Sequence, residues 1–378
     1  MLQAVRFDED DFGVDDERTV VEDLEPSVTR APVPFERLAA LAHGGMGVIE
    51  LARRPGSADL FAVKRMFESD RDDPEVVDMF LDEARIARAV RHPNVVAVTE
   101  VGFDDGGPFI ATEYVEGLTL RDIMKGDAPL PVAFCVEVMT QVARGLHAAH
   151  EAVDEDGLPL DLVHRDVSPP NILVGVDGVA RVLDFGVAKA TGRVTRTVAG
   201  THKGRFSYMS PEQLAHAKID ARSDLFALGV VLYELLAGCH PFGEEGGVGR
   251  AYAVLQGRPP EDVRAHRPDV PPSLAVLLRE LLETTPSRRP ATAGLVAGRL
   301  EAVAAELALR GETPAIGRLL DARHADALAD QRRYVHRVSG APPPPATARR
   351  PLPPLWRVAL TLLGVGFVLG WLLPFALQ

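Results

Sequence analysis

Residues 164–171 read His-Arg-Asp-Val-Ser-Pro-Pro-Asn, and the tripeptide Asp-Phe-Gly follows at residues 184–186. Transfer of a phosphoryl group needs one carboxylate beside the attacking hydroxyl and oxygen ligands that hold a divalent cation against the phosphates. Asp166, Asn171 and Asp184 supply this set, in this order, among apolar and strand-like residues. The stretch therefore indicates a site for phosphoryl transfer.

A glycine-rich turn, His-Gly-Gly-Met-Gly at residues 43–47, lies earlier between two strand-like runs. Glycines let the backbone approach phosphates closely and turn its N–H groups towards them. Lys64 follows in a third such run, where it can reach the phosphates, and Glu83 on the next helical stretch is its natural ion-pair partner. The turn alone fits a plain hairpin equally well, but its order with Lys64 and Glu83 favours a nucleotide site.

The hydrophobic pattern divides the chain into two unequal parts. From residue 35 to about 115, short strand-like runs surround one helical stretch with apolar residues on one face, among them Phe80, Leu81 and Ala84. From about 116 to 300, helical patterns dominate, interrupted by loops rich in Asp, Gly and Pro. The sequence therefore predicts an α+β protein with a small β-rich lobe followed by a larger α-helical lobe.

Both flanks of this region differ from it in composition. Residues 1–34 hold ten acidic residues against three arginines, and we expect a mostly disordered arm there. An Asp-Phe-Gly at residues 11–13 repeats the later tripeptide. Because it precedes every other motif, we do not expect it to belong to the phosphoryl-transfer site. Residues 301–340 have helical patterns, which either finish the large lobe or form a homodimer contact.

The C-terminal region has the composition of a membrane anchor. Residues 341–355 form a Pro-rich linker, and residues 356–377 hold a stretch of about 20 uncharged residues, enough for one transmembrane helix of ~1.5 Å rise per residue across a ~30 Å hydrocarbon core. Trp356 and Trp371 lie towards its ends, and Arg357 lies on its N-terminal side. The positive-inside rule then keeps the preceding domain in the cytoplasm.

Composition excludes other classes of protein. No long Lys/Arg block is present, so an electrostatic footprint for nucleic acid is missing. Cys135 and Cys239 lie far apart and suit a reducing cytosol, where we expect both to be core residues. The acidic N-terminus predicts no secretory signal peptide.

Together these residues resemble a eukaryotic-type, or Hanks-type, serine/threonine protein kinase of bacteria, from about residue 35 to 300. The resemblance rests on the order of the glycine-rich turn, Lys64, residues 164–171 and residues 184–186, followed by Tyr-Met-Ser-Pro-Glu at 208–212. It implies a bilobal protein-kinase-like fold, with the N-lobe and the C-lobe at residues 35–115 and 116–300.

The resemblance also assigns roles. Asp166 becomes the catalytic base, Lys64 with Glu83 the phosphate anchor, and Asn171 and Asp184 the ligands of Mg²⁺ or Mn²⁺. ATP becomes the phosphoryl donor. The nucleotide contacts that it implies fall on Ala42, Gly44, Gly45, Gly47, Ile49, Ala62, Lys64, Thr112, Glu113, Val115 and Leu173.

Three positions depart from the family pattern. Ala42 replaces the first glycine of the phosphate loop, for which we expect a modest loss of nucleotide affinity. Ser168 stands where a lysine normally touches the γ-phosphate, and Arg205 stands where a threonine normally contacts that lysine. One hypothesis is that the Arg205 guanidinium supplies the charge missing at Ser168. The alternative is that Arg205 binds an acidic substrate.

The segment after residue 184 carries expectations about regulation. Arg165, before the catalytic Asp, usually accompanies activation by phosphorylation of this segment, and phosphate adds about −1.5 to −2 charge that can pair with it. The resemblance further implies that Glu212 pairs with Arg289. The candidate acceptors are Thr191, Thr195, Thr197, Thr201 and Ser207, of which the threonines at 195, 197 and 201 are favoured.

These features predict a membrane-tethered serine/threonine protein kinase that phosphorylates protein substrates and itself. A pseudokinase scaffold is the main alternative, but it would normally lose Lys64, Asp166 or Asp184, and all three are present. A small-molecule phosphotransferase is the second, and residues 208–212 together with Arg289 argue against it.

Overall fold

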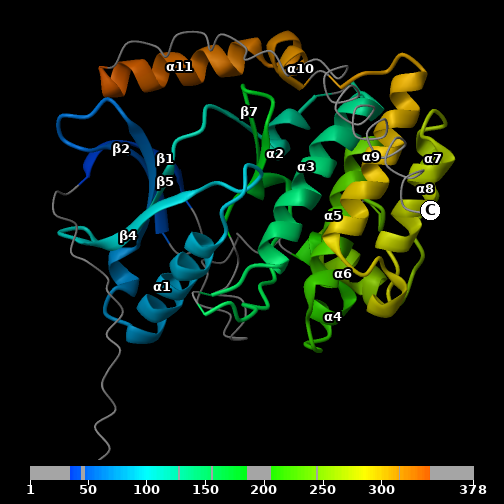
Figure 1. The fold of residues 1–378 in the computed structure, drawn as a ribbon, viewed down its shortest axis with the longest axis horizontal. Coiled ribbons are helices and arrows are strands. Elements are labelled where there is room, and N and C mark those ends of the chain that lie inside the picture. Colours follow the sequence, from blue (N-terminus) through cyan, green and yellow to red (C-terminus); the bar gives the residue numbers. More distant parts are fainter. Residues whose placement is uncertain are drawn as a thin grey trace, which may run out of the picture.

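The computed structural model describes residues 35–43, 47–126, 128–154, 156–184, 206–243, 246–314 and 316–340. Within this part, a sheet-based lobe and a larger helical lobe lie side by side (Figure 1). The bilobal α+β architecture expected from the hydrophobic pattern is therefore confirmed. The acidic arm, the Pro-rich linker and the predicted transmembrane helix lie outside the described residues.

The small lobe is an antiparallel five-stranded sheet in the order β1-β2-β3-β5-β4, with one long helix packed beside it. Asp73 begins that helix by accepting a hydrogen bond from the Glu75 amide, with Pro74 at the first helical position. The elements of this lobe are β1 Glu36–His43, β2 Gly47–Arg53, β3 Leu60–Met66, η1 Glu68–Asp70, α1 Pro74–Ala89, β4 Val98–Asp104 and β5 Gly107–Glu113.

Each face of the small sheet has its own hydrophobic cluster. Phe80, Leu81 and Ala84 of α1 pack against Met66 and Ile110, as the helical pattern predicted. On the other face, Phe35 packs edge-on against Phe61 and Phe109. Because Lys64 pairs with Ile110, Lys64 lies on the side of the sheet that carries α1.

The large lobe is a bundle of helices with a three-stranded sheet, β6-β7-β8, at its border with the small lobe. Its helix α5 begins at the N-cap Asp220 and ends at Gly238, whose φ of 72° is the left-handed conformation that glycine adopts easily. The elements are β6 Gly117–Thr119, α2 Leu120–Ile123, α3 Val132–His150, η2 Pro169–Asn171, β7 Ile172–Gly175, β8 Ala180–Val182, α4 Pro211–Leu214, α5 Ala221–Ala237, α6 Gly247–Leu255, α7 Val263–His266, α8 Pro272–Leu281, η5 Pro286–Arg288 and α9 Ala293–Leu309.

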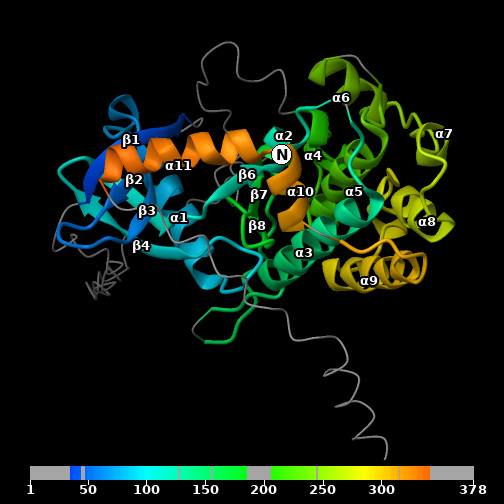
Figure 2. The same ribbon diagram turned by 90° about the horizontal axis from the view of Figure 1, so that it is seen from above.

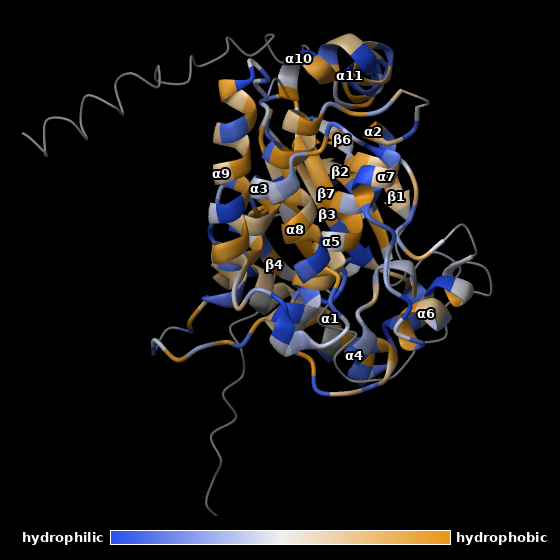
Figure 3. Cartoon of the chain, turned by 90° about the vertical axis from the view of Figure 1, so that its right-hand side faces the viewer, coloured by the Kyte–Doolittle hydropathy of each residue, from blue (hydrophilic) through white to orange (hydrophobic). Residues whose placement is uncertain are grey.

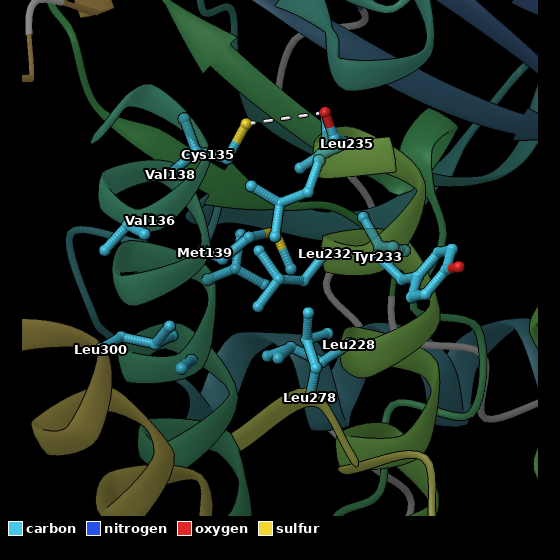
Figure 4. Close-up of a cluster of buried hydrophobic side chains, with 14 of the residues drawn as sticks. Cys135, Val136, Val138, Met139, Leu228, Leu232, Tyr233, Leu235, Leu278 and Leu300 are labelled. Atoms are coloured by element: carbon cyan, nitrogen blue, oxygen red, sulfur yellow. Dashed lines mark hydrogen bonds between the residues drawn. The ribbon is translucent and has the colours of Figure 1, made fainter. Parts of the chain in front are cut away.

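The core of the large lobe lies between α3, α5, α8 and α9 (Figure 4). Met139, Leu228 and Leu232 are fully buried there, and α5 approaches α8 so closely that a Cβ on Gly229 would lie 2.7 Å from the Leu281 Cβ. The expectation for the cysteines holds for Cys135, whose thiol faces the Leu235 carbonyl, whereas Cys239 is only partly buried.

Hydropathy follows this layering, with apolar residues on the inner strands and α5 and polar residues on the outer helix faces (Figure 3). Across the described ranges, no helix is both long enough and apolar enough to cross a membrane.

The C-terminal extension folds back over the molecule. After α9, the helix α10 spans Ile316–Arg323 and α11 spans Ala325–Ser339. Ile316, Leu320 and Leu328 join the core of the large lobe. From α10, which lies beside the large lobe, α11 extends over the small lobe to β1 (Figures 1 and 2). Residues 301–340 therefore pack within their own chain.

Candidate active site

Five predicted nucleotide contacts share one face of the small sheet. Residues directly paired on antiparallel strands point to the same face, and so do residues two apart on one strand. Ala42 pairs with Ile49, Ile49 with Lys64, and Ala62 with Thr112. The strand register thus aligns side chains from β1, β2, β3 and β5 towards one surface.

Local geometry also explains the glycine at position 47 and the orientation of Leu173. A Cβ on Gly47 would lie 1.8 Å from the Arg65 carbonyl oxygen, so only glycine lets β2 approach β3 at this point. Leu173 on β7 points away from its buried neighbours Ile172 and Val174, and is half-buried on the opposite face. Gly44 and Gly45 lie outside the described residues.

The connection between the lobes is fixed by its backbone. The Thr112 hydroxyl donates to the Ala62 carbonyl at 3.2 Å, and the amides of Glu113 and Tyr114 donate to Ala97 and Leu60 at 3.3 Å each. Burial, helped by the charge of Glu116, raises the pKa of Tyr114 to about 12, so the phenol stays neutral. Residues 112–114, within the segment where nucleotide contacts were predicted, are thus hydrogen-bonded to β3 and to the residue that precedes β4.

A buried carboxylate organises the catalytic loop. Asp224 on α5 is 1% exposed and accepts hydrogen bonds from the backbone amides of His164 and Arg165 and from His150 Nε2, each at 2.8 Å. Burial opposes ionisation of Asp224, but these hydrogen bonds outweigh it and hold its pKa below the ordinary value. They also stabilise Arg165 at φ 65°, a conformation that costs a non-glycine residue about 1–3 kcal/mol.

His164 joins the catalytic loop to the segment that carries Asp184. The imidazole is fully buried, and its Nδ1 accepts from the Asp166 amide at 3.2 Å. We assign the proton to Nε2, which donates to the Leu183 carbonyl at 2.7 Å. The Leu183 amide in turn donates to the Asn171 carbonyl at 2.9 Å, so Asn171 and Asp184 lie on adjacent strand ends.

The four polar residues identified from sequence meet between the lobes. Asn171 Nδ2 donates to the Asp166 carbonyl at 2.9 Å, which leaves its amide oxygen to point away from that contact. Asp184, at φ 39° and about half exposed, has its Oδ2 4.0 Å from Lys64 Nζ. The arrangement combines a carboxylate, an amide oxygen and a lysine ammonium group in one place.

This donor set fits a Mg²⁺–nucleotide. Mg²⁺ is usually held by one or two protein oxygens, with water and phosphate oxygens completing an octahedron. Asp184 and Asn171 supply such oxygens. No cluster of three or more His, Cys, Asp or Glu side chains that could hold a metal by itself occurs among the described residues.

Other predicted residues are placed only in part. Glu83 lies on α1, but its side chain and all of Arg205 are outside the described structure. So are the four candidate threonines of the segment between Asp184 and Glu212, here called the activation segment. Ser168 is buried, and its hydroxyl donates to the Asp166 carbonyl at 3.3 Å.

The end of the activation segment carries the ion pair expected between Glu212 and Arg289, with distances of 2.6 and 2.9 Å. Burial opposes ionisation of Glu212, but hydrogen bonds from Arg289 and Ser223 hold its pKa below the ordinary value. On the same segment, Gln213 Nε2 donates to the Arg165 carbonyl at 3.0 Å. The segment therefore ends against the catalytic loop.

Ser207 is disfavoured as a phosphorylation site. It is 3% exposed, its hydroxyl accepts from Arg250, and its carbonyl lies 2.9 Å from His240 Nε2. Burial, with the charge of Arg250, lowers the pKa of His240 to about 4.

The low pKa of His240 predicts a pH-dependent stability. The folded-state pKa of His240 lies below the ordinary value of about 6.5, so the neutral imidazole contributes to the free energy of unfolding. That contribution is complete above about pH 6.5 and is lost as pH falls to about 4. We expect wild type to lose about 2–3 kcal/mol more unfolding free energy than His240→Gln between pH 7 and 4.5. Urea unfolding at both pH values measures this, and equal losses would contradict it.

Sequence reasoning did not assign the roles of Asp224, His150 and Gln213, which hold the catalytic loop. The signal available was an Asp at the start of an otherwise apolar helix, where a buried charge needs partners.

Comparison with known proteins agrees with this geometry. The sequence profile of the protein kinase domain family matches residues 35–299. The kinase domain of PknI from Mycobacterium tuberculosis is similar in structure, at 27% identity and a TM-score of 0.54, covering 73% of this chain and 97% of that one.

The names of the curated relatives specify different hydroxyl acceptors, tyrosine in one relative and serine or threonine in others. "Tyrosine-protein kinase MasK" of Myxococcus xanthus is 41% identical over 72% of this chain and 43% of its own length. "Serine/threonine-protein kinase PknB" of Mycolicibacterium smegmatis is 36% identical over 68% of this chain and 41% of its own. "Serine/threonine-protein kinase PknL" of M. tuberculosis is 36% identical, covering 72% and 66%. The chain thus spans less than half of the first two of these relatives.

Proposed function

Because the chain belongs to the protein kinase family, we propose that it transfers the γ-phosphoryl group of ATP to serine and threonine hydroxyls of proteins, including its own. The observation that supports this most is the meeting of Lys64, Asp166, Asn171 and Asp184 between the two lobes. A pseudokinase scaffold is not favoured, because none of these residues is lost.

In the proposed mechanism, Asp166 accepts the proton of the substrate hydroxyl as its oxygen attacks the γ-phosphorus and the bond to the ADP oxygen breaks. Lys64 binds the α- and β-phosphates. Asn171 and Asp184 would hold Mg²⁺, or Mn²⁺, which neutralises charge on the phosphates. The residues at 112–115 would bind adenine through their backbone.

The hydroxyl class is tested by phosphoamino acid analysis after incubation with labelled ATP and a generic acceptor protein. We expect phosphoserine and phosphothreonine, following the names of the PknB and PknL relatives. Phosphotyrosine alone would overturn the hydroxyl class while leaving phosphoryl transfer intact, as the name of the MasK relative suggests.

The charge missing at Ser168 gives a separate prediction. If Arg205 supplies that charge, Arg205→Ala lowers kcat, and the double variant Arg205→Ala/Ser168→Lys regains most of it. The site at 168 is close to the reaction, because Ser168 contacts the Asp166 carbonyl. Turnover with labelled ATP measures both variants. If lysine at 168 restores nothing, Arg205 acts on the substrate instead.

We also infer activation by phosphorylation at Thr195, Thr197 or Thr201, with Arg165 pairing with the new charge. The support is that Asp224 holds Arg165 at a positive φ. Arg165 also lies beside the end of the activation segment, where Gln213 donates to its carbonyl. Phosphopeptide mapping of wild type against Asp166→Asn identifies the residue.

Finally, we propose a single-pass anchor at residues 356–377, with the kinase domain in the cytoplasm. The support is the uncharged stretch with tryptophans towards both ends and arginines before it. Tethering would raise the encounter rate between neighbouring copies.

A further inference from the structure

The helix α10 ties the C-terminal extension to the large lobe. Ile316 and Leu320 are buried in the core of that lobe. At the end of the helix, the Arg323 guanidinium donates to the carbonyls of Ala128 and Pro129 at 3.1 to 3.2 Å. The start of α11 is therefore fixed relative to the large lobe.

The helix α11 then reaches the small lobe at two places. Arg53 of β2 donates to the Ser339 carbonyl at 2.7 Å, and the Tyr334 hydroxyl donates to the Ala40 carbonyl of β1 at 3.4 Å. Val335 between them is buried. Because β1 and β2 flank the glycine-rich turn, α11 contacts the strands that present this turn (Figures 1 and 2).

Between α10 and its contacts with the small lobe, α11 contacts the connection between the lobes. Arg332 forms an ion pair with Glu116, the residue that follows the predicted adenine contact Val115. The Glu116 side chain is only 16% exposed, and its carbonyl accepts from the Val176 amide at 3.0 Å. One residue of the connection is thus held from α11 on one side and from the end of β7 on the other.

We propose that Arg332 is a positioning residue for the nucleotide site: its ion pair with Glu116 holds the backbone at Val115 in the conformation that binds adenine. This inference rests on the proposed ATP site. Without the pair, the connection samples other conformations, and the apparent affinity for ATP falls by the fraction of molecules that remain competent.

The neighbouring residue supplies a matched control. Arg333 lies on the same helix. Among the described residues its ion pair is with Asp330 of that helix, and both side chains are mostly exposed. Reversing its charge changes the net charge of α11 as much as reversing Arg332, but it does not touch Glu116. A general effect of charge or of helix stability is therefore common to both variants.

The experiment compares the full chain with Arg332→Glu, Arg332→Gln, Arg333→Glu and the swap Arg332→Glu/Glu116→Arg. Binding of Mg²⁺–ATP is measured by calorimetry, KM for ATP and kcat by labelled transfer, and unfolding free energy in urea. We expect loss of one partly exposed ion pair to lower the affinity for ATP about three-fold. Charge repulsion in Arg332→Glu is expected to lower it about ten-fold.

We expect weaker ATP binding and a raised KM in both Arg332 variants, a kcat within about two-fold of wild type, no change in Arg333→Glu, and recovery in the swap. Equal binding by Arg332→Glu and Arg333→Glu would overturn the proposal. So would a swap that restores nothing, or a loss of ATP affinity matched by a loss of unfolding free energy. If wild type itself binds no ATP, the proposed function fails rather than the role of Arg332.

Discussion

Replacement of Asp166 by Asn is expected to lower kcat by about 10²–10⁴-fold, because the amide cannot accept the proton of the attacking hydroxyl. The backbone of residue 166 keeps its bonds to His164 and Asn171, so the fold is expected to persist. KM for ATP should change little, since Asp166 acts on the substrate hydroxyl. Steady-state transfer of labelled phosphate measures both constants.

The control for this variant is its unfolding curve in urea, which should overlay that of wild type. A variant that is folded and retains more than about a tenth of the wild-type kcat would contradict the role of Asp166 as the base.

Replacement of Arg289 by Ala is expected to remove about 3–5 kcal/mol of unfolding free energy, because it leaves the Glu212 carboxylate buried without its counter-ion. The guanidinium is fully buried, and it also donates to the carbonyls of Arg222, Glu283 and Thr284 and lies over the Phe226 ring. Its loss therefore also leaves backbone acceptors unsatisfied.

Arg288→Ala is the matched control, since the neighbouring side chain is 72% exposed and lies 3.9 Å from Glu283. We expect it to stay within about 0.5 kcal/mol of wild type in urea. Similar unfolding midpoints for the two variants would show that the Glu212–Arg289 pair does not anchor the segment.

The sequence predicted the fold class and the place of Lys64 on a strand after the glycine-rich turn, because both depend on local signals. The approach of Lys64 to Asp184 was not among the predictions, which named Glu83 as the partner of Lys64. Alternation of apolar residues defined the strands, a 3.6-residue period defined α1, and Lys64 follows a glycine turn at strand spacing. Once the strands pair in register, the positions of these residues in space follow from their order in the chain.

The hydrogen bonds that Asp224 accepts from the catalytic loop, and the path of α11, could not be predicted in the same way. They depend on contacts between residues far apart in sequence, such as Arg332 with Glu116 and Arg53 with Ser339. Residues 301–340 are amphipathic helices, and an apolar helix face alone does not specify which surface it covers. The amphipathic pattern therefore left open whether this extension packs on its own chain or on a partner.

The most direct test of the central claim is incorporation of labelled γ-phosphate from ATP in the presence of Mg²⁺, with wild type and Asp184→Ala compared over a range of protein concentrations. We predict incorporation by wild type and none above background by Asp184→Ala. Absence of incorporation by wild type at every concentration would contradict phosphoryl transfer and favour a pseudokinase scaffold.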